Sequence, residues 1–278
     1  MSAAAPSPVE AALRREAWIT GAALALLSVL AWAWTLAGAG MGMDAFAMTR
    51  LALFPHLGAA SGGMGAMADT GGGGLGHALL LLSMWWVMMV AMMVPAAAPT
   101  ILLYARTVRR QVARGRMSGR AGTGAFLGGY LAAWLGFSVA AAGLQLGLEA
   151  AGLLRPMLMS GNDARFAAAV LAAAGLWQLS PLKAVCLAHC RSPADWLSRH
   201  WRPGPAGAFR MGVEHGVFCV GCCWALMALL FVGGVMNVVW IAALTLLVAV
   251  EKIAPAGPFV GYAVAALLLL WSVATLLV

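Results

Sequence analysis

Long stretches without a charged residue constrain this chain more than any other feature. No residue from 18 to 43 is charged, and none from 78 to 105. A run of about 18 apolar residues is long enough to cross a bilayer as a helix. Only 9% of the 278 residues are charged and 63% are hydrophobic, whereas a soluble domain has about 25% charged residues. So few charges cannot cover a water-facing surface, and the sequence predicts an all-α, polytopic transmembrane bundle.

The apolar runs predict about seven spans. They lie near residues 17–37, 78–104, 124–150, 165–186, 211–233, 237–252 and 258–277. The sixth is short, and six spans with an interfacial last segment is the alternative. We expect one transmembrane domain over residues 1–278, with a tail at 1–16 and a loop rich in Gly, Met and His at 38–77. The first run lacks a small-residue cleavage pattern, which favours an uncleaved span over a signal peptide.

The basic residues are distributed unevenly between the predicted loops. If the N-terminal tail is cytoplasmic, fourteen of the seventeen Lys and Arg residues fall on that side, and only Arg50, Arg155 and Arg165 fall on the other. Cytoplasmic loops carry such an excess. We therefore expect the N-terminus inside, the C-terminus outside and the loop at 38–77 outside. This orientation accounts for the net charge of +8, and we do not expect nucleic acid as a partner.

The second predicted span carries a stripe of methionines. Met84, Met88 and Met92 are four residues apart and fall within about an 80° arc of a helix, and Met89 and Met93 widen it. Thioether sulfur is a soft ligand that suits Cu(I) and poorly suits Mg or Ca. Methionine is also an adaptable filler of apolar space. Taken alone, the stripe favours packing.

The fifth predicted span combines histidine and cysteine. His215, Cys219 and Cys222 lie within about 60° on a helical wheel, with Cys223 about 40° further round. His215 and Cys222 are about 10.5 Å apart along the axis, which is too far for two ligands about 2.0–2.3 Å from one ion. One ion can therefore take His215 with Cys219, or Cys219 with Cys222 or Cys223, and other helices must supply the rest. The grouping favours metal or redox chemistry over packing.

The fourth predicted span ends with another pair of cysteines. Cys186 and Cys190 face one way if the helix continues past Pro181, and the predicted orientation places them at the cytoplasmic boundary. Two thiolates there could hold Cu(I) or Zn(II) or form a redox pair, and neighbouring basic residues favour thiolate. The alternative is two small residues packed at a helix end. Five cysteines are an odd number, which argues against a disulfide-stapled framework.

Several stretches resemble a family of predicted metal-binding integral membrane proteins, classed as a domain of unknown function. They are MWWVMMVAMMVP (84–95) with Tyr104-Ala105, Tyr130 to Trp134, WQLSPLKAVCLAHCRSP (177–193) and GVEHGVFCVGCCWALMALLFVGGVMNVVWIAALTLLVAVEK (212–252). Trp177 departs from the family, which carries tyrosine there. The resemblance covers about residues 84–252. It implies a copper-linked protein of the bacterial inner (plasma) membrane and brings no established reaction with it.

We therefore expect a membrane protein that binds a soft metal ion, copper first and zinc as the alternative, and transports it or hands it over. The expected partners are the lipid bilayer, the ion, and a metallochaperone or membrane enzyme. No phosphate loop, nucleophile elbow or HExxH helix is present, and we expect no catalytic residue. Two alternatives stay open: a membrane thiol–disulfide redox protein using Cys186/Cys190 or Cys222/Cys223, and an assembly or scaffold subunit with structural cysteines.

Overall fold

The computed structural model is almost entirely helical, as the composition predicts, and describes residues 8–42, 44–49, 74–113, 121–155, 160–161 and 163–277. The helices are α1 (Pro8–Leu36), α2 (Leu75–Ala113), α3 (Ala121–Ala150), α4 (Ala164–Leu179), α5 (Pro181–Arg191), α6 (Pro193–Arg199), α7 (Gly204–Ala228), α8 (Leu230–Gly233), α9 (Val238–Ile253) and α10 (Gly257–Leu277). Two short strands, β1 (Leu154–Arg155) and β2 (Ser160–Gly161), pair antiparallel. Much of the predicted loop at 38–77 lies outside the described residues, as do residues 1–7 of the predicted tail.

Among the described residues, five segments are long and apolar enough to cross a membrane. They are Trp18–Leu36, Leu75–Val112, Gly122–Ala150, Gly204–Gly233 and Gly257–Leu277. The bent pair α4 and α5 would add one more. α9 has 16 residues, or about 24 Å at 1.5 Å per residue, which is shorter than the ~30 Å hydrocarbon core. The count of about seven spans therefore stays a prediction.

The fourth predicted span is not one continuous helix. α4 ends at Leu179, and α5 leaves it at an angle of 63°. Proline disfavours helical geometry in the residue before it, and Ser180 is extended, with φ −67° and ψ 135°. The Ser180 hydroxyl then accepts the backbone N–H of Leu182 and caps α5. The predicted span is therefore bent at Pro181 and not straight, but Cys186 and Cys190 still share one helix, α5. The bend turns α5 toward α7.

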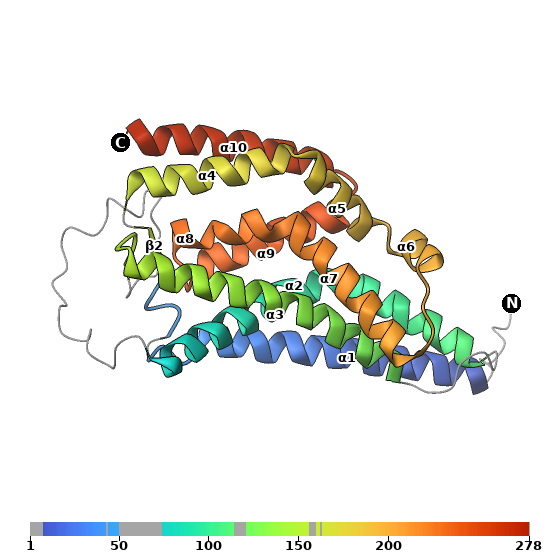
Figure 1. The fold of residues 1–278 in the computed structure, drawn as a ribbon. Coiled ribbons are helices and arrows are strands. Elements are labelled where there is room, and N and C mark those ends of the chain that lie inside the picture. The colour runs from blue at the N-terminus through green and yellow to red at the C-terminus, as the bar shows by residue number, and fades with distance from the viewer. Residues whose placement is uncertain are drawn as a thin grey trace, which may run out of the picture.

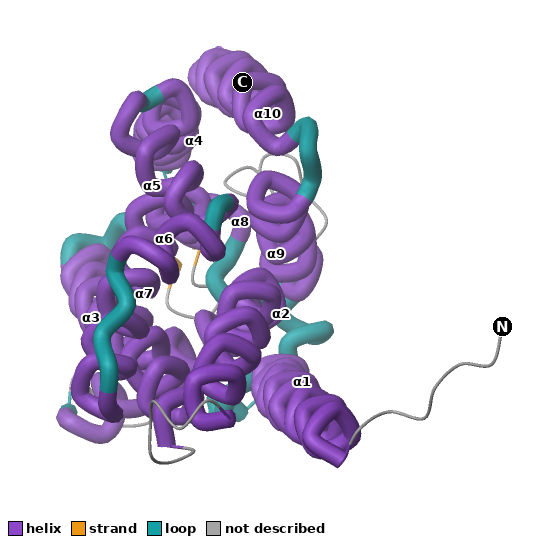
Figure 2. Tube along the Cα trace, turned by 90° about the vertical axis from the view of Figure 1, so that its right-hand side faces the viewer, coloured by secondary structure: helices purple, strands orange, loops and turns teal. Residues whose placement is uncertain are grey.

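The helices form an elongated bundle (Figure 1) in which α4 and α10 lie side by side at one edge and α1 lies at the opposite edge (Figure 2). α3 and α7 touch through their backbones. A Cβ on Gly129 would collide with the Phe209 carbonyl, and a Cβ on Gly212 with the Phe126 carbonyl. Small residues at such a crossing let two helices approach closely, which fixes α3 against the face of α7 that carries its cysteines.

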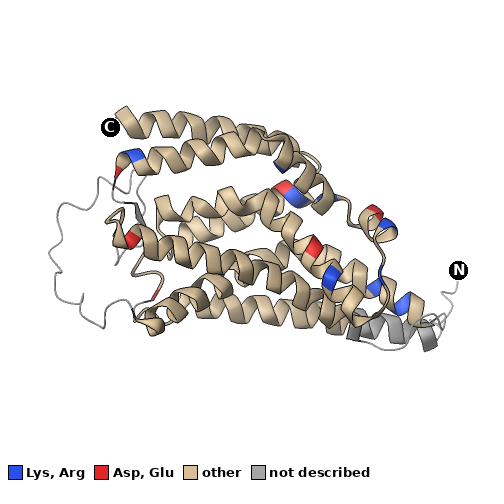
Figure 3. Ribbon diagram, viewed as in Figure 1, with Lys and Arg blue, Asp and Glu red and all other residues tan. Residues whose placement is uncertain are grey.

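The charged side chains are concentrated toward one end of the bundle. Lys and Arg gather toward the end where α1 begins, whereas the opposite end shows mainly acidic residues (Figure 3). Two of the basic residues that the sequence analysis counted on the cytoplasmic side are buried: Lys183 is 3% exposed and Lys252 is 8% exposed. Both side chains therefore lie inside the bundle and not in a water-facing loop.

Candidate metal centre

Four thiols from two helices meet inside the bundle and form what we call the thiol cluster: Cys190 of α5 with Cys219, Cys222 and Cys223 of α7. The sulfurs of Cys222 and Cys223 are 3.2 Å apart. The Cys190 thiol of α5 interacts with the thiols of Cys219 and Cys222. The three cysteines of α7 are buried, and the thiols of all four are free. Cys190 is thus the cysteine that another helix brings to the cysteine-bearing face of α7.

The predicted pair Cys186 and Cys190 plays two different parts. Both side chains lie on α5, one helical turn apart, and α5 packs against α7. Cys190 joins the thiol cluster, whereas Cys186 lies against the α7 backbone, where a Cβ on Gly221 would be 2.8 Å from its sulfur. The absence of a side chain at Gly221 therefore makes room for Cys186 and lets α5 approach α7.

Cys219 has two polar partners that the sequence analysis did not select. The ammonium Nζ of Lys252, on α9, donates to the Cys219 sulfur at 2.9 Å. The Tyr130 hydroxyl, on α3, lies 3.2 Å from the same sulfur. Cys219 is itself only 1% exposed. A positive charge held next to a sulfur in an apolar interior favours its thiolate form, and Cys219 is the cysteine of the cluster that has a cation beside it.

A second set of charges lies immediately beside the cluster. The Glu251 carboxylate accepts from Lys183 at 2.7 Å and from the Gln178 amide at 2.8 Å. Arg191 donates to the Glu251 backbone carbonyl. The carboxylate of Glu251 is thus used by α4 and α5 and not by its neighbour Lys252. Ionisable residues within apolar segments are functional candidates by default, and this signal, present in the sequence at Glu251-Lys252, could have found both residues.

His215 lies one turn before Cys219 on α7, in an aromatic enclosure. Its ring centroid is 5.9 Å from that of Tyr130 and 5.7 Å from that of Trp196, with the His189 ring 6.0 Å away. The Nδ1 atom of His215 and the Nε2 atom of His189 are buried without a hydrogen-bond partner. Sequence analysis selected His215 as a ligand together with Cys219, and the structure adds His189 of α5 as its nearest histidine neighbour.

The methionine stripe of α2 is fully buried, and Met84, Met88 and Met92 have no exposed surface. α2 packs against α1, α3 and α9. The stripe and the thiol cluster are joined through one side chain, because the Tyr130 hydroxyl donates to the Met93 carbonyl at 3.1 Å and also contacts Cys219. The Tyr130 side chain of α3 therefore contacts both the backbone of α2 and the thiol cluster.

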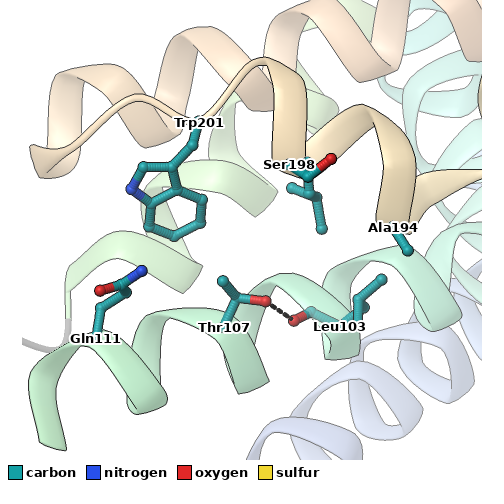
Figure 4. Close-up of a pocket in the computed structure, with 7 residues that line it drawn as sticks. Leu103, Thr107, Gln111, Ala194, Ser198 and Trp201 are labelled. Carbon is teal, nitrogen blue, oxygen red and sulfur yellow. Dashed lines mark hydrogen bonds between the residues drawn. The ribbon is translucent and has the colours of Figure 1, made fainter. Parts of the chain in front are cut away.

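The geometry limits how an ion could be held. Within the described ranges, no group of three or more His, Cys, Asp and Glu side chains is arranged to hold a metal ion. A pocket between α2 and α6 is lined by Leu103, Thr107, Gln111, Ala194, Leu197, Ser198 and Trp201 (Figure 4). These residues include no thiol, thioether or imidazole, so the pocket has no ligand for a soft metal ion. The thiol cluster therefore suits an ion that needs only two thiolate ligands.

Thiols and thioethers are the ligand types that soft metal ions prefer, and the bundle buries both. Residues 82–275 match a family model described as copper chaperone (PpoB2), and the chain belongs to this family. Neither the curated proteins nor the solved structures give a match. The match supports copper and gives no support to zinc. Cu(I) is a soft ion that prefers thiolate and thioether ligands, and the thiol cluster fits it.

Proposed function

We propose that this protein is a multi-pass inner-membrane copper chaperone that binds Cu(I) as its cargo at the thiol cluster and hands it to a partner protein. The observation that carries the proposal is the convergence of Cys190 with the three cysteines of α7 around Cys219. Soft thiolates in a buried, water-poor site select Cu(I) over the hard divalent cations. The family description names the same cargo.

The membrane location is supported by the five segments that are long and apolar enough to cross a bilayer. α1 begins at one end of the bundle and α10 ends at the other (Figure 1), which is what an odd number of crossings produces. The excess of Lys and Arg at the end where α1 begins supports a cytoplasmic N-terminus. We therefore expect alkaline phosphatase fused to the C-terminus to be active, and a fluorescent protein fused there to be dark, because the C-terminus lies outside. The reverse result would contradict the seven-span topology.

The proposed route for copper runs inward from the external side. The loop at 38–77 captures the ion, the thioethers of Met84, Met88 and Met92 carry it into the bundle, and the thiol cluster receives it near His215. Cys190, which belongs to this cluster, and Cys186 lie on α5 toward the cytoplasmic side, where a metallochaperone or a membrane enzyme takes the ion from the cluster. The Tyr130 hydroxyl, which contacts the Met93 backbone carbonyl and the Cys219 sulfur, links α2 to α7 and supports a step between these two helices.

The proposal is tested by metal analysis of detergent-purified protein from copper-supplemented cells. We expect near-stoichiometric copper in the wild type and its loss in the double variant Cys219→Ser/Cys222→Ser. Cys186→Ser is the matched control, because Cys186 lies on the same α5 face but contacts Gly221 and not the cluster. Wild-type protein without copper would contradict the proposal, and so would a double variant that keeps its copper.

A thiol–disulfide redox protein is the second candidate, and the closeness of Cys190 to Cys222 favours it. The adjacent pair Cys222 and Cys223 would bridge only with strain, so a redox protein would use Cys190 with a cysteine of α7. Thiol trapping distinguishes the two functions. A redox protein should yield a protein disulfide and mixed disulfides with partners, whereas a copper chaperone should keep all five thiols reduced.

A further inference from the structure

We propose that Lys252 makes the thiol cluster specific for a monovalent soft cation. This inference rests on the proposed function and adds a specificity-determining residue to it. Lys252 contributes a fixed positive charge to the interior of the bundle, and its Nζ atom donates to the Cys219 sulfur at 2.9 Å. An ion bound by the Cys219 sulfur therefore lies next to the Lys252 ammonium. The net charge of the occupied site depends on the charge of the ion and on that of Lys252.

The Lys252 ammonium contacts a sulfur and not the neighbouring carboxylate, because the Glu251 carboxylate already pairs with another residue. Glu251 pairs with Lys183 at 2.7 Å, and both side chains are almost completely buried. The Cys219 sulfur, 2.9 Å away, is the partner that the structure gives the Lys252 ammonium. A buried charge is stable only when it is paired, so Cys219 supplies the counter-charge of Lys252.

The valence of the ion then decides whether the site is neutral. Two thiolates and one Cu(I) carry a net charge of −1, and the ammonium brings the total to zero. Two thiolates with Zn(II) or Cd(II) are already neutral, so the ammonium leaves a net charge of +1. A third thiolate would restore neutrality, but no three His, Cys, Asp or Glu side chains of the described chain are arranged around one point. An unpaired charge in a medium of low dielectric constant is strongly unfavourable.

A structural role for Lys252 makes a different prediction from a charge role. If Lys252 only supports packing between α7 and α9, its replacement should weaken binding of every ion. If its charge sets the specificity, replacement by an apolar residue of similar length should weaken monovalent ions and strengthen divalent ones. Lys252→Met removes the charge and keeps an unbranched side chain, whereas Lys252→Arg keeps the charge and is the matched control.

The experiment titrates detergent-purified full-length protein with Ag(I), a redox-stable stand-in for Cu(I), and with Cd(II), each against a chromophoric competitor. We expect Lys252→Met to lose about tenfold or more in Ag(I) affinity and to gain in Cd(II) affinity, while Lys252→Arg stays near the wild type. A parallel loss for both ions, or no change, overturns the role of Lys252. A wild type that binds neither Cu(I) nor Ag(I) overturns the proposed function itself.

Discussion

The Tyr130 hydroxyl lies 3.2 Å from the sulfur of Cys219. The same hydroxyl donates to the Met93 carbonyl at 3.1 Å, so one side chain of α3 spans the distance between α2 and α7. The glycine contact between α3 and α7 holds this tyrosine in place, because no side chain at Gly212 separates the two backbones. The helix with the methionines and the helix with the thiols are thereby fixed relative to each other.

Tyr130→Phe should destabilise the protein without removing copper. The phenyl ring fills the same space, but the Met93 carbonyl and the Cys219 sulfur each lose a partner, which costs about 1–3 kcal/mol for buried groups. Thermal unfolding in detergent measures the loss, and metal analysis should still find copper near the wild-type level. A variant that folds normally and is free of copper would instead make the hydroxyl part of the binding site.

Methionine-to-leucine replacement separates transport along α2 from binding at the cluster. Met88→Leu/Met92→Leu conserves volume and should cost less than about 1.5 kcal/mol per site, but it removes two soft ligands. We expect copper delivery to a partner protein in cells to fall while purified protein still binds copper at the thiols. Met227→Leu is the control, since Met227 is equally buried but lies on α7 outside the stripe. Equal copper delivery by the double variant and the control would show that the methionine stripe only fills space in the bundle.

Glu251→Gln should be among the most destabilising single changes. It leaves the Lys183 ammonium buried beside a neutral amide, and breaking a buried ion pair in this way costs about 3–5 kcal/mol. The double variant Glu251→Gln/Lys183→Met removes both charges and should recover most of the loss. Chemical unfolding in mixed micelles gives the comparison. A double variant no more stable than the single one would mean that the pair is not coupled.

The contact between α3 and α7 predicts a sharp difference between two glycines. Gly212→Ala places a methyl group against the Phe126 backbone and should separate the helices, at about 1–3 kcal/mol or more. Gly136→Ala on α3 has nothing within 4 Å of the new methyl group and should be neutral or slightly stabilising, since alanine favours helix. Yield and unfolding temperature of the two variants measure the difference. Similar values would show that the helices can adjust.

The all-α class, the long apolar helices and the soft ligands were predictable because each depends on residues close together in sequence. Helical periodicity places Cys219, Cys222 and Met88 on faces of their own helices. It does not reveal which helices are neighbours, so Cys190 could not be separated from Cys186, and Tyr130 could not be assigned to Cys219. Lys252 was counted as a membrane-boundary charge because a basic residue at the end of an apolar run commonly marks orientation.

Because the chain bends at Ser180 and Pro181, the thiol cluster lies between two helices that are held in different ways, α7 and α5. On one side, α7 packs against α3 through direct backbone contact at Gly129 and Gly212. On the other side, Cys190 is carried by an eleven-residue helix attached to α4 through a bend of 63°. The buried pair of Lys183 with Glu251 holds this short helix against α9. The position of Cys190 therefore depends on side-chain contacts of α5, whereas the positions of Cys219, Cys222 and Cys223 depend on backbone packing of α7.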